Sequence, residues 1–256
     1  MRFWYPNRFA EGQRQKQLPV PVGRLKNKLS KWKEIKANSN VCEMLRNGYK
    51  LPLLTLPSGI ELNNNKSALD NPVFVTAEIQ KLLLQGCITE LKKRPRVVNP
   101  LTVAGDANKQ RLVLDCRHVN PHLYKDKFKY EDARVAREVF KTGDWAITFD
   151  LKSAYHHIEI MEEHRTFLGF AWADKGTRRY YVFNVLPFGL ATAGYVFSKT
   201  MREVVAYWRS LGFKVVMYLN DGLAGSADEN DAEGLSDSIR STLKELGFLI
   251  AEEKCN

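Results

Sequence analysis

The chain has 256 residues, of which 44% are hydrophobic and 27% are charged, and its formal net charge is +10. This composition is typical of one large or two small globular domains and excludes an intrinsically disordered chain. No apolar stretch reaches the ~18 residues that a membrane-spanning helix needs, so we expect no membrane association. The four cysteines lie far apart, which argues against a disulfide framework and favours an intracellular protein, with nucleus and cytoplasm not distinguished.

Basic residues are concentrated in the first half of the chain. Residues 1–128 contain 23 Lys and Arg against 10 Asp and Glu, whereas residues 129–256 contain 16 against 19. A basic segment beside an acidic one suits a polyanion-binding module joined to a site that needs carboxylates. A solvated, lysine-rich surface explains the charge equally well, so both interpretations stay open.

Three regions follow one another along the chain. Residues 1–74 form a polar, irregular extension in which apolar residues at helical spacing predict one or two amphipathic helices between Arg24 and Leu45. In residues 75–144 the expected elements are a helix over 77–84 that Thr76 caps, strands over 97–104 and 111–114, and a helix over 128–140. In residues 145–256 they are strands over 145–150 and 180–185, a helix over 191–209, a hairpin around 218–221, a helix over 231–246 and a strand over 248–251. Hairpins mixed with helices predict an α+β fold with a largely antiparallel sheet.

Polar side chains follow two of the apolar strands. Asp150 ends the strand that begins at Trp145, and Asn220 and Asp221 lie in the turn of the later hairpin. If these strands are neighbours in one sheet, the three side chains converge at its edge. Three carboxylates there would bind two divalent cations for an in-line phosphoryl displacement, and oxygen-only ligands suit Mg²⁺. The alternative is that an aspartate at a strand end is simply a turn former.

Five segments stand out in order along the chain: residues 111–120, 149–158, 186–199, 218–222 and 246–255. Together they resemble the fingers motif and the polymerase motifs A to D of retroelement reverse transcriptases. The resemblance implies one reverse transcriptase domain over residues 75–256, with a fingers-like region at 75–144 and a palm-like region at 145–256 that contains a mostly antiparallel sheet and packed helices. Residues 23–52 and 206–212 are most similar to the tyrosine-recombinase (DIRS-type) retrotransposons.

The resemblance implies catalytic and metal-binding roles for Asp150, Asn220 and Asp221. These residues would hold two Mg²⁺ ions, with Mn²⁺ as a substitute, and the backbone carbonyl of Leu151 would assist. Lys254 would protonate the departing pyrophosphate, although a lysine near a chain end is usually just exposed. The implied partners are an RNA template, a DNA primer and deoxynucleoside triphosphates; no oligomeric state is predicted.

The same resemblance implies a nucleotide-binding set. Lys109 and Arg111 would grip the triphosphate, as charge-assisted contacts to phosphate favour, although a solvated basic turn explains Lys109 nearly as well. Tyr155 would lie under the incoming sugar and exclude a 2′-hydroxyl; an ordinary buried tyrosine is the alternative. Phe188 and Gly189 would let the backbone approach the template–nucleotide pair, because glycine has no side chain to obstruct it.

Two features depart from the family pattern. Asn220 stands where the family has the first aspartate of its Tyr-x-Asp-Asp motif, which removes a full negative charge from the expected metal site. The chain ends at Asn256, just after motif D, so we expect no thumb. Polymerisation is therefore expected to be weak or absent.

Three hypotheses remain open on the sequence. The first is a retrotransposon reverse transcriptase domain that is impaired or inactive. The second is a non-catalytic nucleic-acid-binding protein derived from such an ancestor. The third is an active polymerase that tolerates Asn220, or in which Asn220 is an engineered substitution.

Overall fold

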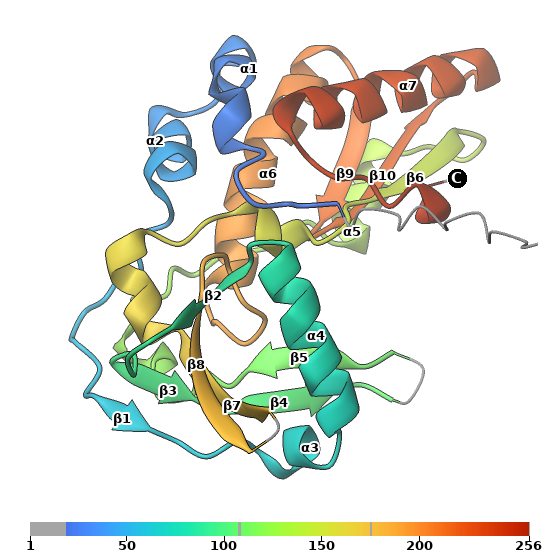
Figure 1. Ribbon diagram of the computed structural model, residues 1–256. Helices are drawn as coiled ribbons and strands as arrows, with labels where there is room; N and C mark the ends of the chain where they lie inside the picture. The colour runs from blue at the N-terminus through green and yellow to red at the C-terminus, as the bar shows by residue number, and fades with distance from the viewer. Residues whose placement is uncertain (1–18, 107–108, 175, 256) are drawn as a thin grey trace, which may run out of the picture.

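The computed structural model describes residues 19–106, 109–174 and 176–255 (Figure 1). The α-helices of this part are α1 (Leu29–Glu34), α2 (Ser39–Asn47), α3 (Lys66–Leu69), α4 (Pro72–Leu84), α5 (Ala133–Val139), α6 (Ala193–Ser210) and α7 (Glu229–Leu246). The strands are β1 (Ile60–Glu61), β2 (Ile88–Leu91), β3 (Val97–Asn99), β4 (Leu101–Ala104), β5 (Arg111–Leu114), β6 (Trp145–Asp150), β7 (Gly169–Asp174), β8 (Thr177–Phe183), β9 (Lys214–Tyr218) and β10 (Asp221–Ser226). None of the helices in the described ranges is long and apolar enough to cross a bilayer.

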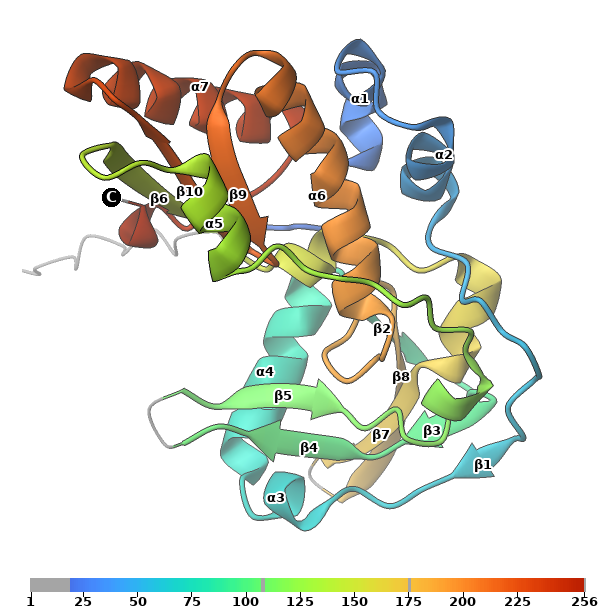
Figure 2. The same cartoon turned by 180° about the vertical axis from the view of Figure 1, so that it is seen from behind.

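A three-stranded antiparallel sheet forms one half of the molecule, with strand order β6-β10-β9. Helices α6 and α7 pack on one face of this sheet, and α5 lies against the opposite face (Figures 1 and 2). Alternate residues face the helices and form the core, among them Phe149, Met217 and Ala224, which are at most 7% exposed. The other face is therefore left to α5 and to solvent.

A five-stranded sheet forms the other half, with strand order β1-β3-β7-β8-β2. Its β1–β3 and β3–β7 pairs are parallel, and its β7–β8 and β2–β8 pairs are antiparallel. Helix α4 and the separate β4–β5 hairpin lie beside it (Figure 1). The predicted α+β class with mostly antiparallel pairing is thus confirmed, and this sheet takes strands from both sides of residue 145.

The predicted N-terminal helices are α1 and α2, and both are part of the core. Trp32 of α1 is fully buried, its indole N–H donates to the Leu246 carbonyl at 3.1 Å, and its ring meets Phe248 edge-on at 5.9 Å. At the start of α2, the Asn38 backbone N–H donates to the Glu203 carboxylate on α6 at 2.8 Å. The N-terminal segment is therefore anchored to α6 and to the end of α7.

Two predicted helix boundaries are wrong. Helix α4 begins at Pro72, where a missing N–H costs nothing, and Thr76 lies inside it with its hydroxyl accepting a hydrogen bond from the Trp172 indole. The helix predicted over 128–140 is only α5, which begins after the Asp132 cap, because the preceding residues run extended along α6. Helices α6 and α7 agree with prediction to within two residues at each end.

Three predicted strands are also corrected. The strand over 97–104 is interrupted at Pro100, and its halves β3 and β4 belong to different sheets. The strand over 180–185 is β8, which begins and ends earlier. The strand over 248–251 is reduced to one isolated bridge between Ile250 and Leu151, because the chain turns at once into the 3₁₀ helix η5 (Glu252–Lys254).

Candidate active site

Asp150 and Asp221 lie opposite each other across the β6–β10 pair. Paired residues of antiparallel strands project to the same face with Cβ atoms about 5 Å apart. Asp150 is 5% exposed, whereas Asp221 faces solvent. The convergence that the sequence predicted is therefore present: a buried and an exposed carboxylate adjoin at one edge of the three-stranded sheet.

Asn220 lies between the two carboxylates. It occupies a two-residue turn with Leu219, whose φ of +53° lies in the left-handed region that costs a non-glycine residue about 1–2 kcal/mol. The Asn220 Nδ2 donates to Asp150 Oδ1 at 2.5 Å and, more weakly, to Asp221 Oδ1 at 3.4 Å. Its backbone carbonyl accepts from the Leu151 N–H at 3.1 Å. The amide thus donates hydrogen bonds to both carboxylates.

The residues fit a magnesium site only in part. Two carboxylates and an amide are hard oxygen donors of the kind that Mg²⁺ accepts. However, Asn220 presents its nitrogen to Asp150, so its oxygen would have to turn before it could become a ligand. The set also carries one negative charge fewer than three carboxylates, and within the described residues no cluster of three or more His, Cys, Asp and Glu side chains is placed to hold a metal ion.

A cavity of about 600 Å³ opens beside the two aspartates. Its walls are α5 and the open face of the three-stranded sheet, where Thr148, Val216 and Leu223 form one cross-strand row. This volume lies within the range of roughly 300–1,000 Å³ typical of ligand pockets. The carboxylates are therefore accessible to a ligand from the side of α5.

The turn after Asp150 presents Tyr155 beside the site. Ser153 adopts a left-handed conformation (φ +55°) and starts the 3₁₀ helix η3 (Ala154–His157). The half-buried Tyr155 ring lies 5.3 Å from the Phe188 ring and 5.7 Å from the Phe197 ring. Burial raises the pKa of its hydroxyl, and the nearby Tyr130 and Tyr218 raise it further. The Tyr155 side chain is thus uncharged and held in place near the N-terminal end of α6.

Phe188 and Gly189 lie in a turn that is pressed against β5. Gly189 has φ +102°, and a Cβ at this position would lie 1.9 Å from the Leu114 carbonyl oxygen. The Phe188 carbonyl accepts from the Leu114 N–H at 2.9 Å, and the Arg111 guanidinium lies 6.0 Å from the Phe188 ring, within cation–π range. Arg111 and the turn are therefore neighbours, and their predicted nucleotide-binding roles stay predictions.

Two predicted site residues are not brought to the aspartates by described contacts. Lys109 is exposed in the connection between β4 and β5, where its backbone N–H donates to the Asp106 carboxylate. Lys254 ends η5, which follows Ala251, whose N–H donates to the Asp150 carbonyl at 2.8 Å. The Lys254 side chain lies outside the described part of the structure, so its predicted role stays a prediction.

Asn120 and Tyr130 support the site, although no role was predicted for them. Asn120 clamps the Phe188–Gly189 turn: its Nδ2 donates to the Gly189 carbonyl, and its Oδ1 accepts from the Ala191 N–H. The Tyr130 ring lies 5.8 Å from the Tyr218 ring of the hairpin. An available signal for Tyr130 was the alternation of aromatic and basic residues over 127–130, which is typical of extended chain rather than helix.

His157 fixes the chain behind the aspartates. It is 2% exposed, its Nδ1–H donates to the carbonyls of Ser153 and Ala154, and its Nε2 accepts from the Leu249 N–H at 3.0 Å. Burial lowers its pKa to about 4, so the ring is neutral near pH 7 and keeps this acceptor. No sequence signal separated this histidine from its neighbours.

Comparison with known proteins gives the context of this geometry. The profile of a family described as "Reverse transcriptase (RNA-dependent DNA polymerase)" matches residues 92–256. The Retrovirus-related Pol polyprotein from transposon gypsy of Drosophila melanogaster is 28% identical over 189 residues, which are 71% of this chain and 17% of that protein. The corresponding polyprotein from transposon 412 of the same species is 24% identical over 261 residues, which are 98% of this chain and 20% of that protein.

A solved structure supports the fold. The crystal structure of Prototype Foamy Virus Protease-Reverse Transcriptase superimposes with a TM-score of 0.63 at 19% identity, covering 83% of this chain and 26% of that one. At this identity the likeness concerns the fold alone. The chain spans a fifth or less of the length of these two curated relatives.

Proposed function

The chain belongs to the reverse transcriptase (RNA-dependent DNA polymerase) family, and on that premise we propose that it is a retroelement polymerase domain whose metal-dependent nucleotide addition is impaired by Asn220. The observation that carries the proposal is the pairing of Asp150 with Asp221 and the hydrogen bond from the Asn220 amide to Asp150. The assignment to the DIRS-type group rests on residues 23–52 and 206–212 and remains a prediction.

The proposed substrates are an RNA template, a DNA primer and deoxynucleoside triphosphates. Arg111 is exposed beside Phe188, where it can bind phosphate oxygens, and Lys109 would reach the same phosphates from the hairpin. Tyr155 would exclude a 2′-hydroxyl from the sugar position. The backbone at Gly189 would lie against the template–nucleotide pair.

Asp150 and Asp221 would hold Mg²⁺, which when bound would stabilise charge on the attacking and leaving oxygens. The Asn220 oxygen would be a third, uncharged ligand. Lys254 would deliver a proton to pyrophosphate.

The charge lost at Asn220 is large enough to decide activity. Two unit charges 4 Å apart interact by about 4 kcal/mol at an effective dielectric of about 20, and a dication roughly doubles this. Since each 1.36 kcal/mol changes a rate about tenfold, losing even half of that stabilisation slows nucleotide addition by on the order of 10³. The native chain is therefore expected to extend primers barely, if at all.

Primer extension on an RNA template, with Mg²⁺ or Mn²⁺, tests this proposal. We expect Asn220→Asp to raise extension by about three orders of magnitude. The matched control is Asn230→Asp, which adds the same charge on an exposed residue of α7 and should change nothing. Robust extension by the native chain that Asn220→Asp does not improve would contradict the proposal.

A second candidate is a nucleic-acid-binding protein that has no polymerase activity. The observation that favours it is the amide at position 220, because two carboxylates and a neutral amide attract a dication less strongly than three carboxylates do. Salt-sensitive RNA binding, combined with no nucleotide incorporation even in Asn220→Asp, would favour this candidate over the first.

A further inference from the structure

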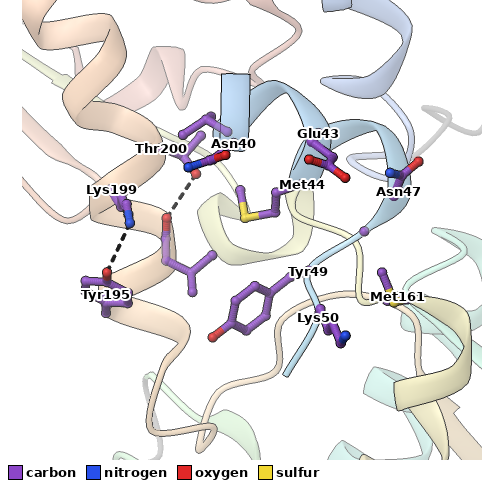
Figure 3. A pocket seen from close by; sticks show the side chains of 13 residues that line it. Asn40, Glu43, Met44, Asn47, Tyr49, Lys50, Met161, Tyr195, Lys199 and Thr200 are labelled. Atoms are coloured by element: carbon purple, nitrogen blue, oxygen red, sulfur yellow. Dashed lines mark hydrogen bonds between the residues drawn. The ribbon is translucent and has the colours of Figure 1, made fainter. Parts of the chain in front are cut away.

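A second cavity, which shares no lining residue with the one beside Asp150, lies between α2 and α6 (Figure 3). Its volume of about 310 Å³ is at the lower end of the usual range for small-ligand sites, which fits one compact group rather than a peptide helix. The residues that line it, here called the α2–α6 pocket, are Asn40, Val41, Glu43, Met44, Asn47, Gly48, Tyr49, Lys50, Met161, Tyr195, Val196, Lys199 and Thr200.

The α2–α6 pocket is held open by backbone contacts. Gly48 has φ +88°, and a Cβ there would lie 2.6 Å from the Met161 backbone nitrogen, so only glycine allows this approach. Directly after it, the Tyr49 N–H donates to the Glu159 carbonyl at 2.7 Å, and the Tyr49 carbonyl accepts from the Met161 N–H at 3.0 Å. The segment that carries the Tyr49 ring is therefore fixed, so ordering it on ligand binding would cost little conformational entropy.

The pocket has an aromatic and apolar centre with a polar rim. Figure 3 shows Tyr49 and Met44 in the middle, with Asn40, Asn47, Lys50 and Lys199 around them. A tyrosine face stacks on any nucleobase, and asparagine amides offer both donors and acceptors to a base edge. The aromatic centre therefore suits the base of a nucleotide, and the lysines of the rim suit its phosphate.

The rim favours an anion. Lys50 and Lys199 are exposed, and within the described residues neither forms an ion pair. Lys199 donates to the Tyr195 hydroxyl at 3.3 Å and lies 5.5 Å from that ring. Glu43 is the one acidic residue of the lining, so the lining residues carry a formal charge of +1, and the Asp126 carboxylate lies next to them, where it accepts from the Tyr195 hydroxyl at 2.7 Å.

We propose that the α2–α6 pocket binds one unstacked nucleotide of a single-stranded nucleic acid, with the base on Tyr49 and phosphates at Lys50 and Lys199. A base can enter such a concave site only when it is splayed out of its strand, which excludes a duplex. This inference rests on the proposed nucleic-acid function but adds a site that involves α2, outside the segment matched by the family profile.

Binding of a fluorescent single-stranded oligouridine of about 12 nucleotides, within the usual site sizes of roughly 4–16, tests the proposal. Replacing Tyr49 by Leu should weaken binding on the order of tenfold, whereas Tyr49→Phe keeps the ring and should bind like the native chain. Lys50→Ala/Lys199→Ala should lower the slope of log affinity against log salt by about 1.4, at about 0.7 per phosphate on single strands. The control Lys28→Ala/Lys33→Ala removes two exposed lysines elsewhere and should leave the slope unchanged.

Photocrosslinking of the same oligomer carrying 5-iodouridine gives the location directly. We expect crosslinks at Tyr49 or Tyr195. Crosslinks confined to other elements, or native-like binding by both pocket variants of a chain that does bind the oligomer, would overturn the pocket and leave the proposed function intact. No binding of any single strand by the native chain would overturn both. A dimer that Lys50→Ala/Lys199→Ala dissociates would instead assign the pocket to a second copy and also overturn the proposal.

Discussion

Asn99 and Asn220 put the same amide group in two contrasting regions, the core of the five-stranded sheet and the edge of the three-stranded sheet. Asn99 is fully buried, and its Nδ2 donates to the carbonyls of Phe167 and Gly169, each at 3.0 Å. Asn220 is half-buried and donates to two carboxylates. The first amide satisfies neutral backbone where β3 meets β7 and stabilises the fold. The second donates to two carboxylates, at the site where we propose that the loss of one charge impairs nucleotide addition.

We expect the largest effect at Gly189, whose turn lies between the two regions in sequence and packs against Leu114 of the separate β4–β5 hairpin. Gly189→Ala would drive a Cβ into the Leu114 carbonyl at a positive φ and should destabilise the protein by about 4 kcal/mol, measured by urea unfolding. The control is Gly143→Ala, at φ +95° with nothing within 4 Å of the added Cβ, which should cost only the ~1–2 kcal/mol of backbone strain. Equal losses in the two variants would show that the close approach of Gly189 to the Leu114 carbonyl adds nothing to the cost of backbone strain.

The edge of the three-stranded sheet should be sensitive to acid through His157. Its pKa is about 4 in the folded chain and about 6.5 when unfolded, so between these values the unfolded chain binds more protons. The contribution of His157 to the free energy of unfolding is therefore complete above pH 6.5 and falls by about 3 kcal/mol as the pH drops to 4.

Burial lowers the pKa of the neighbouring His156 as well, so His157→Gln should remove only part of the loss of stability at low pH. Unfolding free energies from pH 4 to 7 measure it. A variant with the same pH dependence as the native chain would rule out His157 as a contributor.

Removing the Asn99 amide from the core of the five-stranded sheet should change the stability of the protein but not its response to metal. Asn99→Ala removes one hydrogen bond from each of two backbone carbonyls in the core and should cost about 2 kcal/mol, while the response to Mg²⁺ stays unchanged. Asn63→Ala, at an exposed asparagine, should cost nothing measurable. If Asn99→Ala changed the response to Mg²⁺, the claim that the Asn99 and Asn220 amides have different roles would be wrong.

The three-stranded sheet was largely predictable because its information is local. Short stretches of sequence predict its elements. These are the apolar strand before Asp150, the tight turn at Asn220 and the apolar stripes of α6 and α7. The convergence of Asp150 with Asp221 was conditional on β6 and β10 being neighbours, which their local patterns do not record and the strand pairing shows.

The five-stranded sheet was not predictable in the same way. Parallel pairing of Val98 with Gly169 joins segments that share no turn, and neither segment carries a signal for its partner. The extended course of Tyr130 and the α2–α6 pocket likewise depend on packing against α6, which no local pattern records.

Thermal unfolding of the native chain and of Asn220→Asp, each with EDTA or with Mg²⁺, tests the central claim most directly. Asn220→Asp replaces a donor to the buried Asp150 by a like charge, so in EDTA it should be less stable by about 1–3 kcal/mol. Mg²⁺ should restore that loss by binding the folded variant, and should leave the native chain nearly unchanged. A native chain that Mg²⁺ stabilises as much as the variant would contradict the account.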